Sequence, residues 1–217
     1  GGSSGRAELP GNDSIVTIGS WGLNTGTSKS TNILNNFMAG TVLHEFGHNL
    51  NLGHGGNSSI NYKPNYLSSM NYLYQLDGLP PDNKIGDRYY ITNYKDNSSC
   101  GSINAYSDLQ SGPNVSGMVI GFSNGSGANL TESSQAESVG LGRTNPIGVD
   151  FNCDGSIGTL SNFNLNTKWD ADSNTNSDTL TDYNDWANIN IIFNEKSSGQ
   201  TRLLRNFSTS NFNNEII

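Results

Sequence analysis

The chain has 217 residues, a formal net charge of −8 and a sequence pI of about 4.6. An acidic balance of this size argues against nucleic acid or an anionic membrane surface as a partner, because both attract basic proteins. No apolar run approaches the length of a membrane-spanning helix. Only 33% of the residues are hydrophobic, which predicts a modest core that bound ions or a cross-link would help to stabilise.

The chain begins with a glycine- and serine-rich segment, residues 1–5, of the kind found in linkers and processed loops. Residues 14–20, Ser-Ile-Val-Thr-Ile-Gly-Ser, then alternate in the manner of a β-strand. The sequence therefore predicts a strand shortly before the segment that contains the histidines.

All three histidines of the chain lie within residues 44–54, His-Glu-Phe-Gly-His-Asn-Leu-Asn-Leu-Gly-His. His44 and His48 are four residues apart, so on a helix they lie on one face about one turn apart. His54 follows where the chain must turn back to reach the same ion. Asn51 suits the end of the helix, because asparagine tolerates the left-handed conformation. Three neutral imidazoles with one open coordination position are typical of a catalytic zinc site.

Glu45 stands beside His44, as the H-E-x-x-H zinc-protease motif requires. The apolar residues of this helix fall on the side opposite to His44 and His48, and we expect that side to pack in the core. These residues are Ala39, Val42, Leu43, Phe46 and Leu50.

Two motifs carry a resemblance to a known family. Residues 44–54 resemble the metzincin signature H-E-x-x-H-x-x-G-x-x-H, with Asn51 in place of the usual glycine. Residues 68–72, Ser-Ser-Met-Asn-Tyr, are similar to the Met-turn that lies beneath the zinc in that family, with Met70 as its methionine. The resemblance, which extends to secreted microbial members, implies an α+β fold. It would have a small mixed sheet and the active-site helix in the N-terminal part, and a loop-rich C-terminal lobe below the zinc cleft.

The resemblance also implies one catalytic domain over residues 1–217. Residues 1–53 would end the upper lobe with the zinc helix, and residues 54–217 would form the lower lobe with the Met-turn and candidate calcium loops. Metzincins usually carry a substantial sheet and a helix before the zinc helix, whereas 43 residues precede His44 here. We therefore expect that N-terminal strands are missing, and that a cleaved N-terminal fragment of the same precursor is a candidate partner. A naturally compact family member is the alternative.

The function implied by the resemblance is that of a secreted zinc-dependent endopeptidase that acts on a peptide or protein substrate. His44, His48 and His54 would hold Zn²⁺, and Glu45 would act as general base on the zinc-bound water. Tyr72 matches a tyrosine that approaches the zinc or the reacting carbonyl in some members. Whether Tyr72 is catalytic or only packs stays open.

The family resemblance also suggests where the substrate binds. In metzincins the strand before the zinc helix forms the edge of the sheet and pairs with the extended substrate. We expect residues 14–20 to be that strand, with the peptide adding to its exposed edge.

A second metal signature lies downstream. Side-chain oxygens occupy positions 1, 3, 5 and 7 of an EF-hand-like loop, which predicts Ca²⁺ as a second cofactor. These residues are Asp150, Asn152, Asp154 and Ser156. Position 12 is Ser161, which lacks the bidentate carboxylate. The missing ligand could come from the acidic stretch that follows, which contains Asp170, Asp172, Asn174, Asn176 and Asp178, with Asp182 and Asp185 close behind. A solvated loop rich in Asp and Asn is the alternative.

The two cysteines of the chain, Cys100 and Cys153, are the candidates for a disulfide. An even count in an apparently extracellular chain favours a bridge. Two unpaired thiols, or pairing with another molecule, remain the alternatives.

Two other functions stay open. The Asp-Asn-Asp-Gly pattern resembles the calcium loops of dockerin-like interaction domains, although a dockerin needs two such loops in tandem. A non-catalytic peptidase-like domain that binds zinc or calcium for structure or adhesion is the second alternative. Glu45 argues against it, because a purely structural zinc site needs no general base. A thermolysin-like site would need a downstream glutamate ligand, which His54 makes unnecessary.

Overall fold

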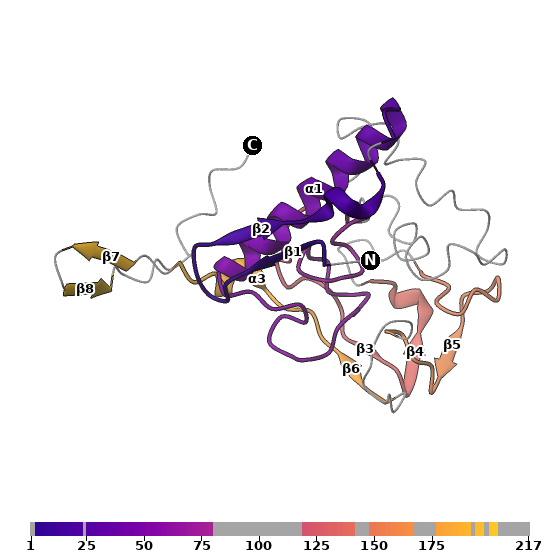
Figure 1. Cartoon of the computed structure of the whole chain (residues 1–217). Coiled ribbons are helices and arrows are strands. Elements are labelled where there is room, and N and C mark those ends of the chain that lie inside the picture. Colours follow the sequence, from indigo (N-terminus) through magenta and orange to yellow (C-terminus); the bar gives the residue numbers. More distant parts are fainter. Residues whose placement is uncertain are drawn as a thin grey trace, which may run out of the picture.

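The computed structural model describes residues 3–23, 25–79, 119–141, 148–166 and 177–191, and the backbone of two strands near the C-terminal end. These parts form a small α/β structure in which one long helix is combined with short antiparallel sheets (Figure 1). Among the described residues, no helix combines the length and the apolar character that a membrane crossing requires.

The long helix α1, Ser28–Asn49, carries the first two histidines. The Thr27 hydroxyl caps its start by accepting a hydrogen bond of 3.2 Å from the backbone N–H of Ser30. The helix ends at a left-handed turn, because Asn51 has φ of 72°. There the backbone N–H of Leu52 bonds to the Gly47 carbonyl at 2.9 Å, in the pattern of a Schellman motif.

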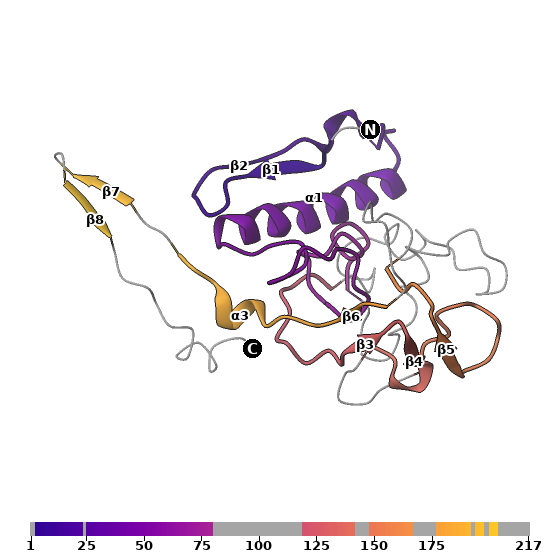
Figure 2. The ribbon, with the colours of Figure 1, turned by 90° about the horizontal axis from the view of Figure 1, so that it is seen from below.

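A two-stranded hairpin covers one side of α1. Strand β1, Gly5–Ala7, pairs antiparallel with β2, Ser14–Val16, and both strands lie along the helix (Figure 2). The strand predicted over residues 14–20 is therefore shorter than expected, since the 3-10 helix η1, Ile18–Trp21, follows at once. The physical reason is the burial of Ile18, which turns inward to pack against Phe37 of α1.

The lower part of the molecule contains short strands on the other side of α1 (Figure 2). Strand β3, Leu130–Thr131, pairs with β6, Thr179–Leu180, and β4, Ser134–Ala136, pairs with β5, Thr159–Ser161. The remaining elements are η4, Glu137–Val139, α3, Asp185–Asn188, and the hairpin of β7, Asn194–Ser197, and β8, Gln200–Leu203. All four described sheets are two-stranded and antiparallel, so the described residues contain no mixed sheet of the kind predicted.

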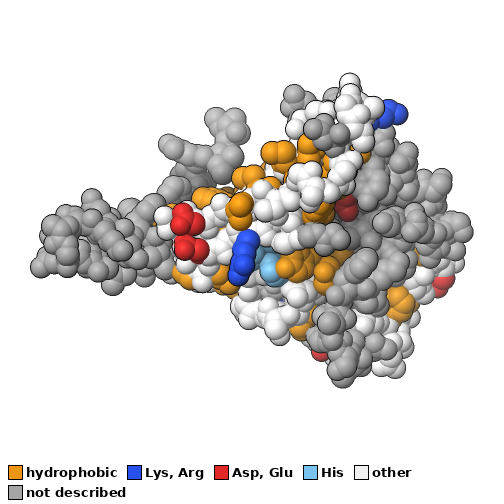
Figure 3. Space-filling model, viewed as in Figure 1, with side chains coloured by type: hydrophobic (Ala, Val, Ile, Leu, Met, Phe, Trp, Pro, Cys, Tyr) orange, Lys and Arg blue, Asp and Glu red, His pale blue; other side chains and the backbone are white. Residues whose placement is uncertain are grey.

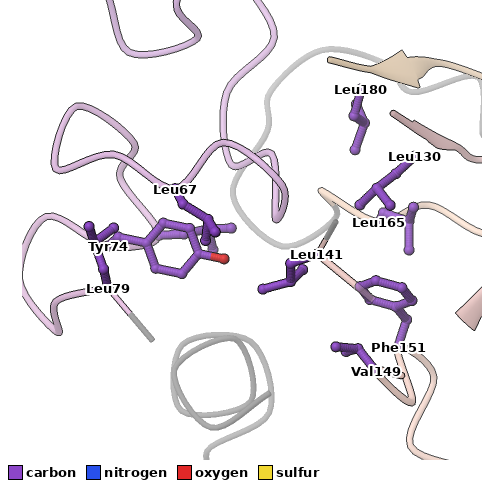
Figure 4. Close-up of a cluster of buried hydrophobic side chains, with 10 residues drawn as sticks. Leu67, Tyr74, Leu79, Leu130, Leu141, Val149, Phe151, Leu165 and Leu180 are labelled. Carbon is purple, nitrogen blue, oxygen red and sulfur yellow. The ribbon is translucent and has the colours of Figure 1, made fainter. Parts of the chain in front are cut away.

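Two hydrophobic clusters hold the lower part together. The larger one contains ten buried side chains from residues 67–180, among them Tyr74 and Phe151 (Figure 4). The second lies directly beneath the end of α1 and consists of Leu50, Leu52, Tyr66, Met70 and Phe122. Tyr183, Ile189 and Ile191 pack against this second cluster, so this apolar segment lies under the helix end.

The prediction that the apolar side of α1 packs in the core is wrong in part. Val42 and Phe46 are 52% and 51% exposed, and Ala39 is also exposed. Of the five residues, only Leu50 is buried, and Leu43 is half-buried against the second cluster. The reason is that the hairpin and the lower part contact α1 on its other sides, and no described element covers the side of Val42 and Phe46.

Candidate metal centre

The three histidines come together at the C-terminal end of α1. His44, His48 and His54 each offer a ring nitrogen, and these atoms lie within 4.8 Å of one another. The Nε2 atoms of His48 and His54 are 2.9 Å apart. His44 is buried, whereas the other two are half-buried, and Figure 3 shows a histidine side chain reaching the surface beside hydrophobic and basic side chains. This is the one group of three or more potential ligands from His, Cys, Asp and Glu among the described residues.

Backbone carbonyls set the orientation of the first two rings. The Nδ1 atom of His44 lies 2.8 Å from the Ser69 carbonyl, and the Nδ1 atom of His48 lies 2.9 Å from the Leu52 carbonyl. A carbonyl only accepts hydrogen bonds, so each Nδ1 carries the proton and each Nε2 keeps a free lone pair. An imidazole bound to a metal through Nε2 usually donates its Nδ1–H in this way.

The site also keeps its histidines neutral. Burial lowers the pKa of His44 to about 3, with His48 and His54 contributing repulsion, and burial lowers the pKa of His54 to about 4. The pKa of His48 is lowered as well, chiefly by burial. Because a metal binds only the neutral ring, these histidines would bind without first releasing protons at neutral pH.

The end of α1 and the Met-turn segment bring the third histidine and Met70 into place. The left-handed turn at Asn51 reverses the chain so that His54 returns to the face of His48. Met70 is fully buried and lies against Gly47, where a Cβ atom would collide with the Met70 sulfur. Glycine at position 47 therefore lets the methionine approach the helix beneath the histidines.

Two further side chains adjoin the histidines. Glu45 is only 4% exposed, burial raises the pKa of its carboxyl group, and no described residue is hydrogen-bonded to it. The ring of Tyr72 lies 4.1 Å from that of His54, centroid to centroid, and 38% of Tyr72 is exposed. The pKa of Tyr72 is raised, first by burial and then by Tyr62 and Glu45. A buried carboxyl group and an accessible phenol thus lie on the same face as the three imidazoles.

The donor set fits zinc. Zinc–nitrogen distances of about 2.0–2.1 Å in a tetrahedron place ligand nitrogens about 3.3 Å apart. The 2.9 Å separation of the His48 and His54 nitrogens would widen slightly to reach this value, and the widest separation within the group, up to 4.8 Å, would have to close. Three histidines with no fourth side-chain ligand match a site that leaves one position open.

Sequence reasoning missed several residues that shape this site. Gly5 of β1 lies so close to Glu45 that a Cβ atom at Gly5 would collide with the Glu45 carboxyl group. Strand β1 therefore lies next to Glu45, and residues 14–16 of the expected strand pair with it as β2; the substrate-binding role expected of residues 14–20 stays a prediction. The carbonyls of Ser69 and Leu52 were missed because a backbone group leaves no signal in the sequence.

The predicted calcium loop is held together by hydrogen bonds among its own residues. The Asp150 carboxylate accepts hydrogen bonds from the backbone N–H groups of Asp154 and Gly155, at 3.1 and 2.8 Å. The Asp154 carboxylate accepts bonds from Ser156 and Asn152, which lower its pKa. The loop is mostly exposed. These bonds do not test calcium binding, which stays a prediction.

The other predicted residues are spread out or lie outside the described parts. Asp170, Asp172 and Cys100 fall outside the described residues. Asp178 is half-buried beside Glu132, whose carboxylate accepts a bond from the Asp178 backbone N–H at 3.2 Å. Cys153 is buried, and its disulfide with Cys100 stays a prediction.

Comparison of the chain with protein-family models, with curated proteins and with solved structures found no match. A function for this chain is therefore inferred from the residues of the site.

Proposed function

We propose that this chain is a secreted zinc-dependent endopeptidase of the metzincin type. The observation that carries the proposal is the convergence of three neutral imidazoles, two of them oriented through Nδ1 by backbone carbonyls, next to the Glu45 carboxyl group. The Met70 side chain packed beneath the helix at Gly47 adds support, because it corresponds to the second motif of the resemblance.

In the proposed reaction, the three histidines would hold Zn²⁺, which would supply Lewis-acid activation of a water molecule and of the peptide carbonyl. The Glu45 carboxylate takes a proton from the attacking water and delivers it to the leaving amine. Burial suits this role, because a raised carboxyl pKa strengthens the base and lets it return the proton. The Tyr72 hydroxyl, at the accessible side of the site, would donate a hydrogen bond to the developing oxyanion.

The proposed substrate site lies along β1. Within the described residues β1 pairs only with β2, so no strand covers its other edge, where the Gly5 carbonyl accepts a hydrogen bond from the Ser3 hydroxyl. Gly5 brings this strand next to Glu45. An extended peptide that adds to the free edge of β1 would place its backbone beside the general base.

The test is cleavage of a mixed peptide library by the whole chain, with the zinc content of each sample determined. Glu45→Gln keeps the size of the side chain and should bind zinc like the parent but lose cleavage by a factor of about 10² or more. His48→Ala should lose both zinc and cleavage. Glu137→Gln is the matched control, because Glu137 is also a buried glutamate but bonds to Phe151 and Gly158 in the lower part.

Cleavage retained in Glu45→Gln would refute the proposed mechanism. Zinc bound by the parent without any cleavage would favour the alternative of a non-catalytic zinc-binding domain. Absence of zinc binding in the parent would refute the metal site itself.

A further inference from the structure

A buried carboxylate from the C-terminal part lies under the Met-turn segment. Asp185, the first residue of α3, is fully buried and accepts three hydrogen bonds. The Tyr66 hydroxyl donates to Oδ1 at 2.7 Å, and the Ser68 hydroxyl and the Ser123 backbone N–H donate to Oδ2 at 2.6 and 2.9 Å. A buried charge needs such donors, since an isolated one would carry a large desolvation cost.

The bond between Asp185 and Ser68 connects the carboxylate to the turn that orients His44. The Ser68 oxygen also accepts a bond of 3.1 Å from the backbone N–H of Met70. Ser69, between them, presents the carbonyl that holds Nδ1 of His44 at 2.8 Å. The Asp185 carboxylate therefore holds the turn on which the orientation of the His44 ring depends.

The same C-terminal segment also holds the loop that contains His54. The Lys63 ammonium is buried and donates to the Gly55 carbonyl at 2.8 Å and to the Thr181 carbonyl at 2.6 Å. The Tyr66 hydroxyl, which bonds mainly to Asp185, is also 3.4 Å from the Gly53 carbonyl. Gly53 and Gly55 flank His54 in the chain. Each is thus hydrogen-bonded to a side chain that also bonds to residues 181–185.

We propose that Asp185 is a positioning residue of the metal centre: its carboxylate holds the Ser68–Met70 turn so that the Ser69 carbonyl orients His44 for metal binding. The inference rests on the metal-binding part of the proposed function and does not require hydrolysis. It assigns a role in the site to a residue far along the chain, in a segment with no metal ligand among its described residues.

The experiment compares Asp185→Asn with the parent in the whole chain. Asparagine has the same shape but replaces one carboxylate oxygen by an N–H₂ group, so it can no longer accept all three of these bonds. Zinc affinity is measured by competition with a chelator, and Co²⁺ replaces Zn²⁺ so that its visible absorption reports the ligand geometry. We expect a 10- to 100-fold loss of zinc affinity, the usual effect of removing an outer partner, and an altered Co²⁺ spectrum.

Glu137→Gln is the matched control, since it alters a carboxylate that is equally buried and that accepts two backbone N–H bonds, at 2.7 and 2.8 Å. Its zinc affinity should stay within about threefold of the parent, because Phe151 and Gly158 do not support a histidine. Circular dichroism of the metal-free samples establishes that each variant is folded. Parent-like affinity in Asp185→Asn, or an equal loss in Glu137→Gln, would overturn the proposal.

Ser68→Ala tests the same connection if Asp185→Asn does not fold. It leaves the carboxylate and its bonds to Tyr66 and Ser123, and it removes the Ser68 bond to Asp185 together with the bond that Ser68 accepts from the Met70 backbone. A loss of zinc affinity of about tenfold is expected, and an unchanged affinity would overturn the proposal. Zinc affinity is measured without any peptide cleavage. A parent that binds zinc but cleaves nothing would therefore refute the proposed peptidase function, and the role of Asp185 could still be tested. A parent without zinc affinity would refute both.

Discussion

The contact between Gly47 and Met70 determines whether replacing Gly47 by alanine stabilises or destabilises the protein. In an exposed helix, replacing glycine by alanine stabilises the protein by up to about 1 kcal/mol. At position 47 the new Cβ atom would overlap the Met70 sulfur, and it would lie 3.0 Å from a ring carbon of Phe122. Met70 is fully buried, so its side chain would have to repack against its neighbours to make room. Overpacking of this kind costs about 1–3 kcal/mol.

We therefore expect Gly47→Ala to lower the free energy of unfolding by up to about 2 kcal/mol after a helix gain of about 1 kcal/mol is subtracted. Urea unfolding of the metal-free chain measures this change, and a thermal melt should show a Tm lower by up to about 6 °C. Gly19→Ala is the control, because a Cβ atom at Gly19 meets no atom within 4 Å. Its stability should stay within about 0.5 kcal/mol of the parent.

A second variant isolates the contact. In a Met70→Ala background the overlap is gone, so Gly47→Ala should become neutral or stabilising there, and the two substitutions should couple by at least about 1 kcal/mol. A Gly47→Ala protein that is more stable than the parent would refute the packing of Met70 against the helix. Additive effects of the two substitutions would do the same.

Three further predictions concern the turn, the tyrosine and pH. Asn51→Gly should leave stability nearly unchanged, whereas Asn51→Ala should cost about 1 kcal/mol in urea unfolding, because φ is 72° there; equal costs would refute the left-handed turn. If the Tyr72 hydroxyl stabilises the oxyanion, Tyr72→Phe should lower kcat by about 10² with little change in KM; a parent-like kcat would mean that the ring only packs. Burial lowers the pKa of His44 from 6.5 to about 3, so the unfolded chain takes up a proton that the metal-free folded chain refuses. Stability present above pH 6.5 is then lost as the pH falls, by about 1.4 kcal/mol per pH unit from this residue. Comparison with His44→Gln isolates the effect, because carboxyl groups such as Asp185, whose pKa is raised to about 6, act in the opposite direction; parallel pH profiles would contradict it.

The helix around the histidines and its end could be predicted because both depend on near neighbours in the chain. The spacing of His44 and His48 places them on one face of any helix, and asparagine is suited to the left-handed turn that follows. The strands were harder to predict. With two to four residues each, they are too short for an alternating pattern to identify them, and the mixed sheet inferred from the family resemblance is not among the described elements.

The buried face of the helix is a further limit on the sequence prediction. The pattern placed Val42 and Phe46 in the core, yet both are half-exposed. Which apolar side of a helix is covered depends on the elements that pack against it, and the helical period contains no information about those elements.

The sequence was sufficient to propose the three histidines, Glu45 and the order of the two motifs, because residue type and local spacing define which groups can meet on one helix and one turn. The tertiary structure was needed to show the rest. It brings Gly5 next to Glu45, the Ser69 carbonyl to His44, and Asp185 beneath the turn that contains Met70. These contacts join residues far apart in the chain, and several involve backbone groups that are chemically alike at almost every position. Only packing in three dimensions selects which of those groups support the candidate metal centre.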